Sequence, residues 1–186
     1  MSEPSDRLTN LVGALSLALS DRVRDATETE AGFRAAAPAA LVALHEFLGH
    51  GTMDQLGRAV GLSPSGAVRL VDRLVRQGYV KRLPGSDGRS VALVLTGPGR
   101  AAARRVRAAR SEALRHVLAT LPAADVASLT RITEHLLGAI TRERLAARDQ
   151  GHDPSGGWLC RLCDFDACGR QDGTCPAASS AQTHER

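Results

Sequence analysis

The sequence has no apolar run that approaches the ~20 residues that a helix needs to cross a bilayer. Its first residues also lack the basic start and the apolar centre of a signal peptide. There is no nucleotide-binding glycine loop and no set of serine, histidine and aspartate residues suited to catalysis. These absences lead us to expect a cytoplasmic protein that has no membrane partner and is not an enzyme.

Lysine is scarce and cysteine is unevenly placed. Lys81 is the only lysine, so the formal net charge of +4 comes almost entirely from arginine. In an alanine-rich chain, this excess is weak evidence for phosphate binding by itself. Cysteine is absent before residue 160, and all four cysteines lie in the last 27 residues. In a cytosolic chain such thiols are expected to bind a ligand or to serve redox chemistry rather than to form structural disulfides.

The pattern of residues 52–96 predicts a helix, a tight turn, a second helix and a two-stranded hairpin. Thr52 is expected to cap the first helix, and Gln55 completes a capping box. Gly61 ends that helix, Ser63 is the next N-cap, and Pro64 occupies the first position of the second helix. Two well-defined helices are therefore separated by a very short turn.

The second helix, residues 65–76, has two different faces when its residues are placed at about 100° each. Its apolar face carries Ala67, Val68, Leu70, Val71, Leu74 and Val75. Its polar face carries Ser65, Arg69, Asp72, Arg73 and Arg76. Arginines on a short second helix suit a helix-turn-helix, because the major groove admits one helix and arginine binds guanine edges bidentately. The same pattern also fits a solvated helix whose arginines pair with Asp72.

Residues 79–83 and 90–96 carry apolar side chains at alternate positions, which is typical of strands. Residues 84–88, Pro-Gly-Ser-Asp-Gly, join them with residues that favour turns. The hairpin would carry Arg82 and Arg89 beside this turn. We interpret it as a wing next to the helix pair.

Residues 87–96 match the wing pattern D-x-R-x-x-x-L-x-L-T of the MarR family, and residues 70–74, Leu-Val-Asp-Arg-Leu, are similar to its recognition helix. The chain therefore resembles the MarR family of winged helix-turn-helix transcription regulators over about residues 5–149. The resemblance implies a mainly α fold with a small β-hairpin wing, flanked by long dimerisation helices. It also implies a homodimeric regulator that binds double-stranded DNA at a pseudo-palindromic operator, most often as a repressor that a small-molecule effector releases.

Long amphipathic stretches flank the helix pair, with apolar residues every three or four positions in residues 6–26, 99–120 and 122–150. Asp6 is the expected cap of the first stretch, and Leu15 and Leu136 lie on the apolar stripes. Each stripe needs a partner surface, and in the resembled family these helices form the dimer interface. The expected organisation is an N-terminal dimerisation helix (1–30), a winged helix-turn-helix domain (34–97), C-terminal dimerisation helices (98–150) and a tail (151–186).

The DNA contacts are assigned to residues of the second helix, its cap and the wing: Ser63, Ser65, Arg69, Arg73, Arg76, Arg82 and Arg89. Ser65 and Arg69, near the start of the helix, are expected to reach bases, and the later arginines and the wing are expected to bind phosphate. Further arginines are expected to form a solvated face that pairs with Glu112 or with a neighbouring subunit: Arg100, Arg104, Arg107 and Arg110.

The tail begins with a linker by composition, residues 151–157. It continues as a C-x₂-C-x₄-C-x₆-C array of Cys160, Cys163, Cys168 and Cys175. Four thiolates with this spacing predict a zinc site, and the proline after the last cysteine also suits an iron–sulfur cluster. Metal-free redox thiols are a third reading. Residues 177–186 are small and polar and are expected to be disordered.

Two other functions compete with DNA-binding regulation. The tail could carry the main activity as a redox or metal centre, although a site with all four ligands filled leaves no open catalytic position. The winged domain could instead bind protein. Binding to random duplexes with a steep salt dependence would favour the DNA-binding function, because a protein-binding wing has no reason to show it. A redox or metal signal at the tail would be a second way to release a repressor.

Overall fold

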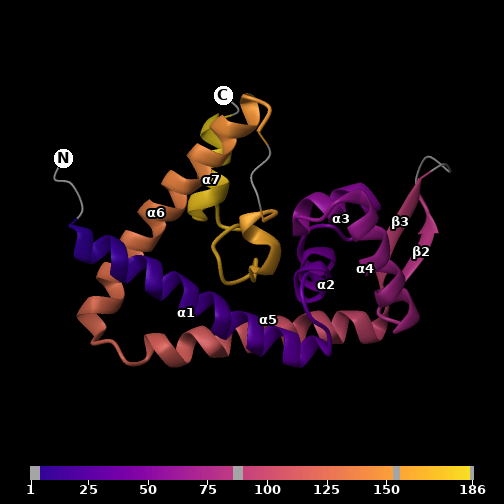
Figure 1. Ribbon diagram of the computed structural model, residues 1–186, viewed down its shortest axis with the longest axis horizontal. Coiled ribbons are helices and arrows are strands. Elements are labelled where there is room, and N and C mark those ends of the chain that lie inside the picture. The colour runs from indigo at the N-terminus through magenta and orange to yellow at the C-terminus, as the bar shows by residue number, and fades with distance from the viewer. Residues whose placement is uncertain (1–4, 86–89, 153–155, 185–186) are drawn as a thin grey trace.

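The structure is a computed structural model that describes residues 5–85, 90–152 and 156–184. Its elements are, in order, α1 (Asp6–Ala31), α2 (Ala37–Glu46), β1 (Gly51–Thr52), α3 (Met53–Val60), α4 (Pro64–Arg76), β2 (Val80–Pro84), β3 (Val91–Leu95), α5 (Gly97–Leu118), α6 (Ala123–Asp149), the 3₁₀ turn η1 (Leu159–Leu162) and α7 (Pro176–His184). The predicted fold class, mainly α with a small wing, is confirmed. Figure 1 shows the sheet at one end of the molecule and the start of α1, with α6 beside it, at the other.

Helices α3 and α4 begin as their sequences predict. The Gln55 backbone N–H donates to Thr52 Oγ1 at 3.2 Å, and the Thr52 N–H donates back to Gln55 Oε1 at 2.8 Å, which confirms the capping box. Gly61 ends α3 in the left-handed region at φ 72°. Ser63 then accepts the Gly66 N–H at 3.3 Å and begins α4. These caps fix the tight turn between the two helices.

One hydrophobic core joins α2, α3, α4, the sheet and the first half of α5. Its largest fully buried side chains include Leu41, Leu56, Leu74, Leu93 and Val106, one from each of these elements. Val68 is an exception to the predicted packing face, because its side chain is 43% exposed. At about 100° per residue it lies at the edge of the apolar arc, beside the polar face of α4.

The wing is part of a three-stranded antiparallel sheet with the order β1-β3-β2. The sequence predicted two strands and missed β1, in which Gly51 pairs with Leu93 and Thr52 with Ala92. Two extended residues, the second of which is the helix cap, are too short to give a strand pattern, yet they pair with the open edge of β3. The hairpin tip, including Arg89, lies outside the described residues.

Thr96, the last residue of the wing motif, joins the sheet to α5. Its hydroxyl donates to the Gly78 carbonyl at 2.6 Å and accepts the Gly99 N–H at 3.1 Å, so it caps α5. Gly99 is required by a close approach, since a Cβ there would lie 2.0 Å from the carbonyl oxygen of Tyr79. The motif therefore contributes to the junction between wing and α5.

The two long outer helices leave their apolar stripes uncovered. Helix α1 lies along α5 and buries only Thr27 and Ala31 near its end. Its start is capped by Ser5, which accepts the Leu8 N–H at 3.2 Å, so the predicted cap Asp6 is wrong and Asp6 is instead the first helical residue. The exposed apolar side chains of α1 and α6 are Leu8, Leu11, Val12, Leu15, Leu17, Val126, Leu129, Ile132, Leu136, Leu137 and Ile140.

The end of the chain is helical rather than disordered as far as His184. Helix α7 packs against α6, where Ser180 is buried and its hydroxyl donates to the Gly138 carbonyl at 3.4 Å. His184 Nε2 lies 2.7 Å from an Asp149 carboxylate oxygen. The prediction of disorder failed because small alanine and serine side chains permit close packing against a neighbouring helix. Within the described residues, no helix is both long enough and apolar enough to span a bilayer.

Candidate functional site

The outer face of α4 presents a basic surface. Ser65, Val68, Arg69, Arg73 and Arg76 are all exposed on it. They occupy a helix whose opposite side is anchored in the core. The surface combines guanidinium groups with one hydroxyl and one apolar side chain. This is the chemistry that reads phosphates, base edges and thymine methyl groups.

The remaining two predicted contact positions in the described part of the chain have structural partners. The Ser63 hydroxyl caps α4 and lies 3.4 Å from the Ser65 hydroxyl. Arg82 of β2 donates to an Asp72 carboxylate oxygen of α4 at 2.6 Å. The acid of α4 thus ties the wing to the helix. Arg82 is about one-third exposed, so one side of its guanidinium remains accessible beside α4.

The segment 156–175, which we call the cysteine segment, lies between two parts of the molecule. Figure 1 shows it beside α2 and α3 on one side and near α6 and α7 on the other. The Trp158 N–H donates to the Ala59 carbonyl at 2.8 Å, at the end of α3. Arg144 of α6 donates to the Gly157 carbonyl. The segment therefore bridges the helix-turn-helix and an outer helix.

Two glycines allow this contact. Gly61 and Gly157 both have positive φ, 72° and 75°. A Cβ on Gly157 would lie 2.6 Å from both the Ala59 carbonyl oxygen and the Gly61 nitrogen. Backbone meets backbone here, at the turn between α3 and α4, so no larger residue fits at either glycine.

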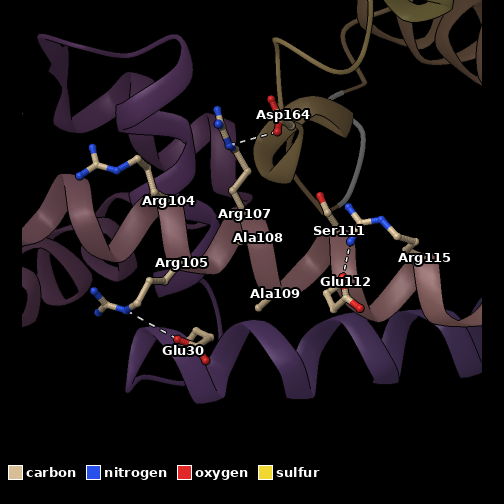
Figure 2. A pocket seen from close by; sticks show the side chains of 10 residues that line it. All are labelled: Glu30, Arg104, Arg105, Arg107, Ala108, Ala109, Ser111, Glu112, Arg115 and Asp164. Carbon is tan, nitrogen blue, oxygen red and sulfur yellow. Dashed lines mark hydrogen bonds and ion pairs between the residues drawn. The ribbon is translucent and has the colours of Figure 1, made fainter.

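A charge cluster holds the segment to α2 and α5. The Glu46 side chain is only 5% exposed and accepts from Arg107 at 2.5 Å, from the Phe165 N–H at 3.0 Å and from His45 at 2.9 Å. Arg107 also contacts Asp164 at 3.3 Å, an interaction that Figure 2 shows. Burial alone would raise the pKa of Glu46, but the hydrogen bonds from Phe165, His45 and Arg107 and the charge of Arg107 together lower it.

Aromatic rings make a second attachment. Phe47 stacks on Trp158 with ring centroids 5.5 Å apart and on Phe165 with centroids 5.4 Å apart. The Arg170 guanidinium lies 5.0 Å from the Phe165 ring centroid. One phenylalanine of the helix-turn-helix domain thus contacts an aromatic ring at each end of the Cys160–Cys163 turn.

The four cysteines are free thiols. The backbone groups them in two pairs, because the Cys163 N–H donates to the Cys160 carbonyl at 2.9 Å and the Cys175 N–H donates to the carbonyl of Gly169, the residue after Cys168, at 3.1 Å. The contact with Cys163 lowers the pKa of Cys160 to about 7, whereas it raises the pKa of Cys163. Burial raises the pKa of Cys168. Among the described residues, no three cysteine, histidine or acidic side chains are arranged to hold a metal ion.

Sequence reasoning missed the attachments of this segment. Arg107 was expected on a solvated face, but it is half-buried and binds Glu46 and Asp164. It lines a cavity of about 610 Å³ between α1, α5 and the segment, shown in Figure 2, together with Arg104, Arg105 and Glu30. The sequence does place a glutamate next to a phenylalanine at the end of α2. That pair alone does not reveal that its partner is Phe165, 119 residues away.

A MarR family model matches residues 32–90. YusO from Bacillus subtilis has a TM-score of 0.61 and 21% identity, over 72% of this chain and 97% of YusO. The Mycobacterium tuberculosis MarR family protein RV2887, in complex with p-aminosalicylic acid, has a TM-score of 0.55 and 27% identity, over 69% of this chain and 97% of RV2887. CouR from Rhodococcus jostii RHA1, bound to p-coumaroyl-CoA, has a TM-score of 0.53 and 23% identity, over 73% of this chain and 95% of CouR. No curated protein matches the chain in sequence.

These matches cover nearly all of each solved structure and leave more than a quarter of this chain without a counterpart. The family model spans α2, the helix-turn-helix and β2, the elements that carry the basic surface. The matched motif, the capped helix pair, the wing and the shared architecture agree with one another. Residues 32–90 of this chain match the MarR family, and its fold is that of the MarR family structures.

Proposed function

We propose that this protein is a homodimeric, sequence-specific DNA-binding transcription regulator, acting in the cytoplasm as a repressor. The observation that carries the proposal is the exposed face of α4, which is anchored by its apolar side and presents Arg69, Arg73 and Arg76 outward. One α-helix with such a face fits the major groove. The wing beside it adds Arg82, which Asp72 holds against α4.

The proposed DNA-contacting residues of α4 have different roles according to their position along the helix. Ser65, Val68 and Arg69 lie in its first half and contact base edges, with Arg69 suited to guanine and Val68 to a thymine methyl group. Arg73 and Arg76 lie further along and contact phosphate, where they contribute affinity without sequence preference. Arg89, outside the described residues, is assigned to phosphate at the wing tip.

The exposed stripes of α1 and α6 support a dimer. Leu15 and Leu136 are 52% and 49% exposed in the single chain, within two continuous apolar surfaces. A second copy that covers them would produce a two-fold symmetric molecule with two α4 helices about one duplex turn apart. The operator is then a pseudo-palindrome whose half-site spacing follows the dimer geometry.

A small-molecule effector is the proposed release signal. RV2887 and CouR were solved with p-aminosalicylic acid and p-coumaroyl-CoA, respectively, so two members of this fold hold aromatic carboxylic acid derivatives. In this chain, a cavity of about 620 Å³ lies between α1, α2 and η1, lined by Leu19, Val23, Pro38 and Leu162 among others. A ligand there would touch both an outer helix and the helix-turn-helix domain.

Selection of bound duplexes from a random pool tests the proposal. The wild-type protein should enrich a pseudo-palindrome, with an affinity that falls steeply as salt rises. Arg69→Ala should reduce discrimination at one base pair per half-site by about 1–3 kcal/mol. Arg69→Lys is the matched control, since it retains the charge and loses the bidentate fork. It should keep the salt dependence and still lose the discrimination.

Arg73→Ala should behave differently. It should weaken binding to all duplexes alike and make the salt slope shallower by about two per dimer, from a coefficient of roughly 0.9 per phosphate. Wild-type protein that enriches no sequence and binds random duplexes without salt dependence would contradict DNA binding and favour a protein-interaction module.

A further inference from the structure

We propose that Cys160, Cys163, Cys168 and Cys175 together bind one zinc ion, and that the ion sets how firmly the cysteine segment bridges the helix-turn-helix and α6. The zinc site is inferred from the four cysteines and does not depend on the proposed function. The effect of zinc on DNA binding rests on the proposed function.

Each thiol pair is held by its own turn. Cys160 lies on η1 and Cys163 is its C-cap, and the Cys163 N–H donates to the Cys160 carbonyl at 2.9 Å. Cys168 and Cys175 are brought together by a loop in which the Thr174 and Cys175 N–H groups both donate to the Gly169 carbonyl, at 2.8 and 3.1 Å. Each turn brings two cysteines close together along the backbone, and a four-sulfur zinc site is commonly built from two such pairs.

The two pairs are neighbours. The Cys168 N–H donates at 3.0 Å to the carbonyl of Asp164, the residue that follows Cys163, so a single backbone turn connects the first pair to the second. In the described residues, three or more of these side chains are not arranged to hold an ion. A tetrahedral ion with sulfur ligands at about 2.3 Å would draw them together, and each bound thiol would release its proton to solvent.

Nearby cations match the charge of such a site. Zinc with four thiolates carries a net charge of about −2. Arg170 lies over the Phe165 ring within the same segment, and Arg110 of α5 lines a cavity together with Leu159 and Leu162 of η1, so two cations lie near the cysteines. The segment itself buries few apolar side chains, so packing alone contributes little to its stability. A zinc ion bound by both turns would contribute the rest of the free energy needed to order the segment.

The residues between the two pairs make the contacts with α2 and α5. Asp164 and Phe165 follow Cys163 directly, and they contact Arg107, Glu46 and Phe47. Closing the pairs on an ion fixes the loop from which these two residues project. Zinc binding therefore stabilises the charge cluster and the aromatic stack, and losing the ion loosens both.

Zinc content and thiol reactivity test the site without DNA. Full-length protein purified anaerobically should contain about one zinc per chain and should show protected thiols until a chelator removes the ion. Cys160→Ser and Cys175→Ser, one from each pair, should each abolish stoichiometric zinc. Asp172→Asn, an exposed substitution in the same loop, is the matched control and should leave it unchanged.

Several results would overturn the site. Iron with acid-labile sulfide would replace the zinc assignment with a cluster. Protein without metal and with four freely titratable thiols, or with a Cys160–Cys163 disulfide, would overturn metal binding. If both cysteine variants fail to fold, zinc is titrated into metal-free wild-type protein while the tryptophan emission is recorded. Saturation at about one zinc per chain supports the site, and no change overturns it.

Trp158 reports on the bridge, because it is the only tryptophan and it stacks on Phe47. Removing zinc should shift its emission to the red as the stack opens, and returning zinc should reverse the shift. An emission spectrum that is unchanged by zinc removal would overturn the link between the ion and docking.

The effect on DNA is measured with a duplex selected from a random pool by the zinc-loaded protein. Removing zinc should weaken binding to that duplex by about fivefold or more, within the usual range for coupling between two sites. Glu46→Gln should still bind zinc but lose most of this dependence, because it removes the charge that pairs with Arg107 and leaves one acceptor oxygen in place of two. Affinity that stays within twofold after zinc removal would overturn the coupling, and zinc content would still test the site.

Discussion

The helix-turn-helix domain and the outer helices have the same kind of apolar pattern but opposite environments. Leu56 and Leu74 of α3 and α4 are completely buried within one chain. Leu15 and Leu136 of α1 and α6 are about half exposed, although they recur at the same three- and four-residue spacing. The difference indicates that the first set is satisfied within the chain and that the second set needs another surface. A second copy of the chain is the partner that we propose.

The largest expected effect comes from placing a charge on the outer stripes. Leu15→Asp would put an unpaired carboxylate into the proposed apolar interface, which costs several kcal/mol unless the interface opens. We expect the variant to sediment as a monomer at micromolar concentration.

Leu17→Asp is the control for that experiment. Leu17 is 69% exposed and lies on the opposite side of α1, about 180° from Leu8 at 100° per residue. This variant should remain a dimer. Wild-type protein that sediments as a monomer would show that the stripes are not an interface between copies.

The next largest effect belongs to the core of the helix-turn-helix domain. Leu74→Ala removes a fully buried side chain of α4 and should lower the free energy of unfolding by about 2–5 kcal/mol, measured by chemical denaturation. Sedimentation should show that the folded variant is still a dimer. A loss of less than about 1 kcal/mol would mean that α4 is less tightly anchored than its burial indicates.

A smaller effect is expected from a substitution that disturbs only the contact between the cysteine segment and α3. Gly157→Ala would place a methyl group 2.6 Å from backbone atoms of Ala59 and Gly61, so the segment should move away from α3 and the Trp158 emission should shift to the red. Gly156→Ala is the matched control. Its φ is also positive, at 87°, but nothing lies within 4 Å of the added carbon. Equal responses of the two variants would show that backbone conformation, not contact with α3, causes the change.

The smallest effect is a pH dependence of the same contact. The pKa of Glu46 is lowered in the folded protein, so its carboxylate stabilises docking above the ordinary glutamate value of about 4.3. That stability is lost as the pH falls through the lowered value. The Trp158 emission should therefore report undocking only in acid, and Glu46→Gln should lack this step. An unchanged acid transition in Glu46→Gln would assign it to another group.

The sequence predicted the helix-turn-helix domain well because its signals are local. The capping box at Thr52, the cap at Ser63 and the second strand of the wing each depend on residues a few positions apart, and all three formed as predicted. The short strand β1 was missed because it depends on the distant edge of β3. The basic face of α4 was also predictable, apart from the exposure of Val68.

The cysteine segment could be predicted in composition but not in placement. The array of thiols is visible in the sequence, whereas the contacts of Glu46 with Phe165 and of Trp158 with Ala59 join positions about a hundred residues apart. Helix α7 was missed for a similar reason, because its small residues gain stability from α6 and not from a pattern of their own. Single-chain periodicity also does not distinguish a core from an interface between copies.

The mass of the protein–DNA complex tests the central claim most directly. A duplex selected from a random pool, carrying one copy of the enriched pseudo-palindrome, should be bound by two chains, with half-sites about one helical turn apart. Sedimentation equilibrium at fixed salt gives this stoichiometry. Two chains per duplex, reduced to a weak single-chain complex in Leu15→Asp, is the predicted result. A wild-type complex with one chain per duplex, or an enriched site without two-fold symmetry, would contradict the homodimeric DNA-binding account.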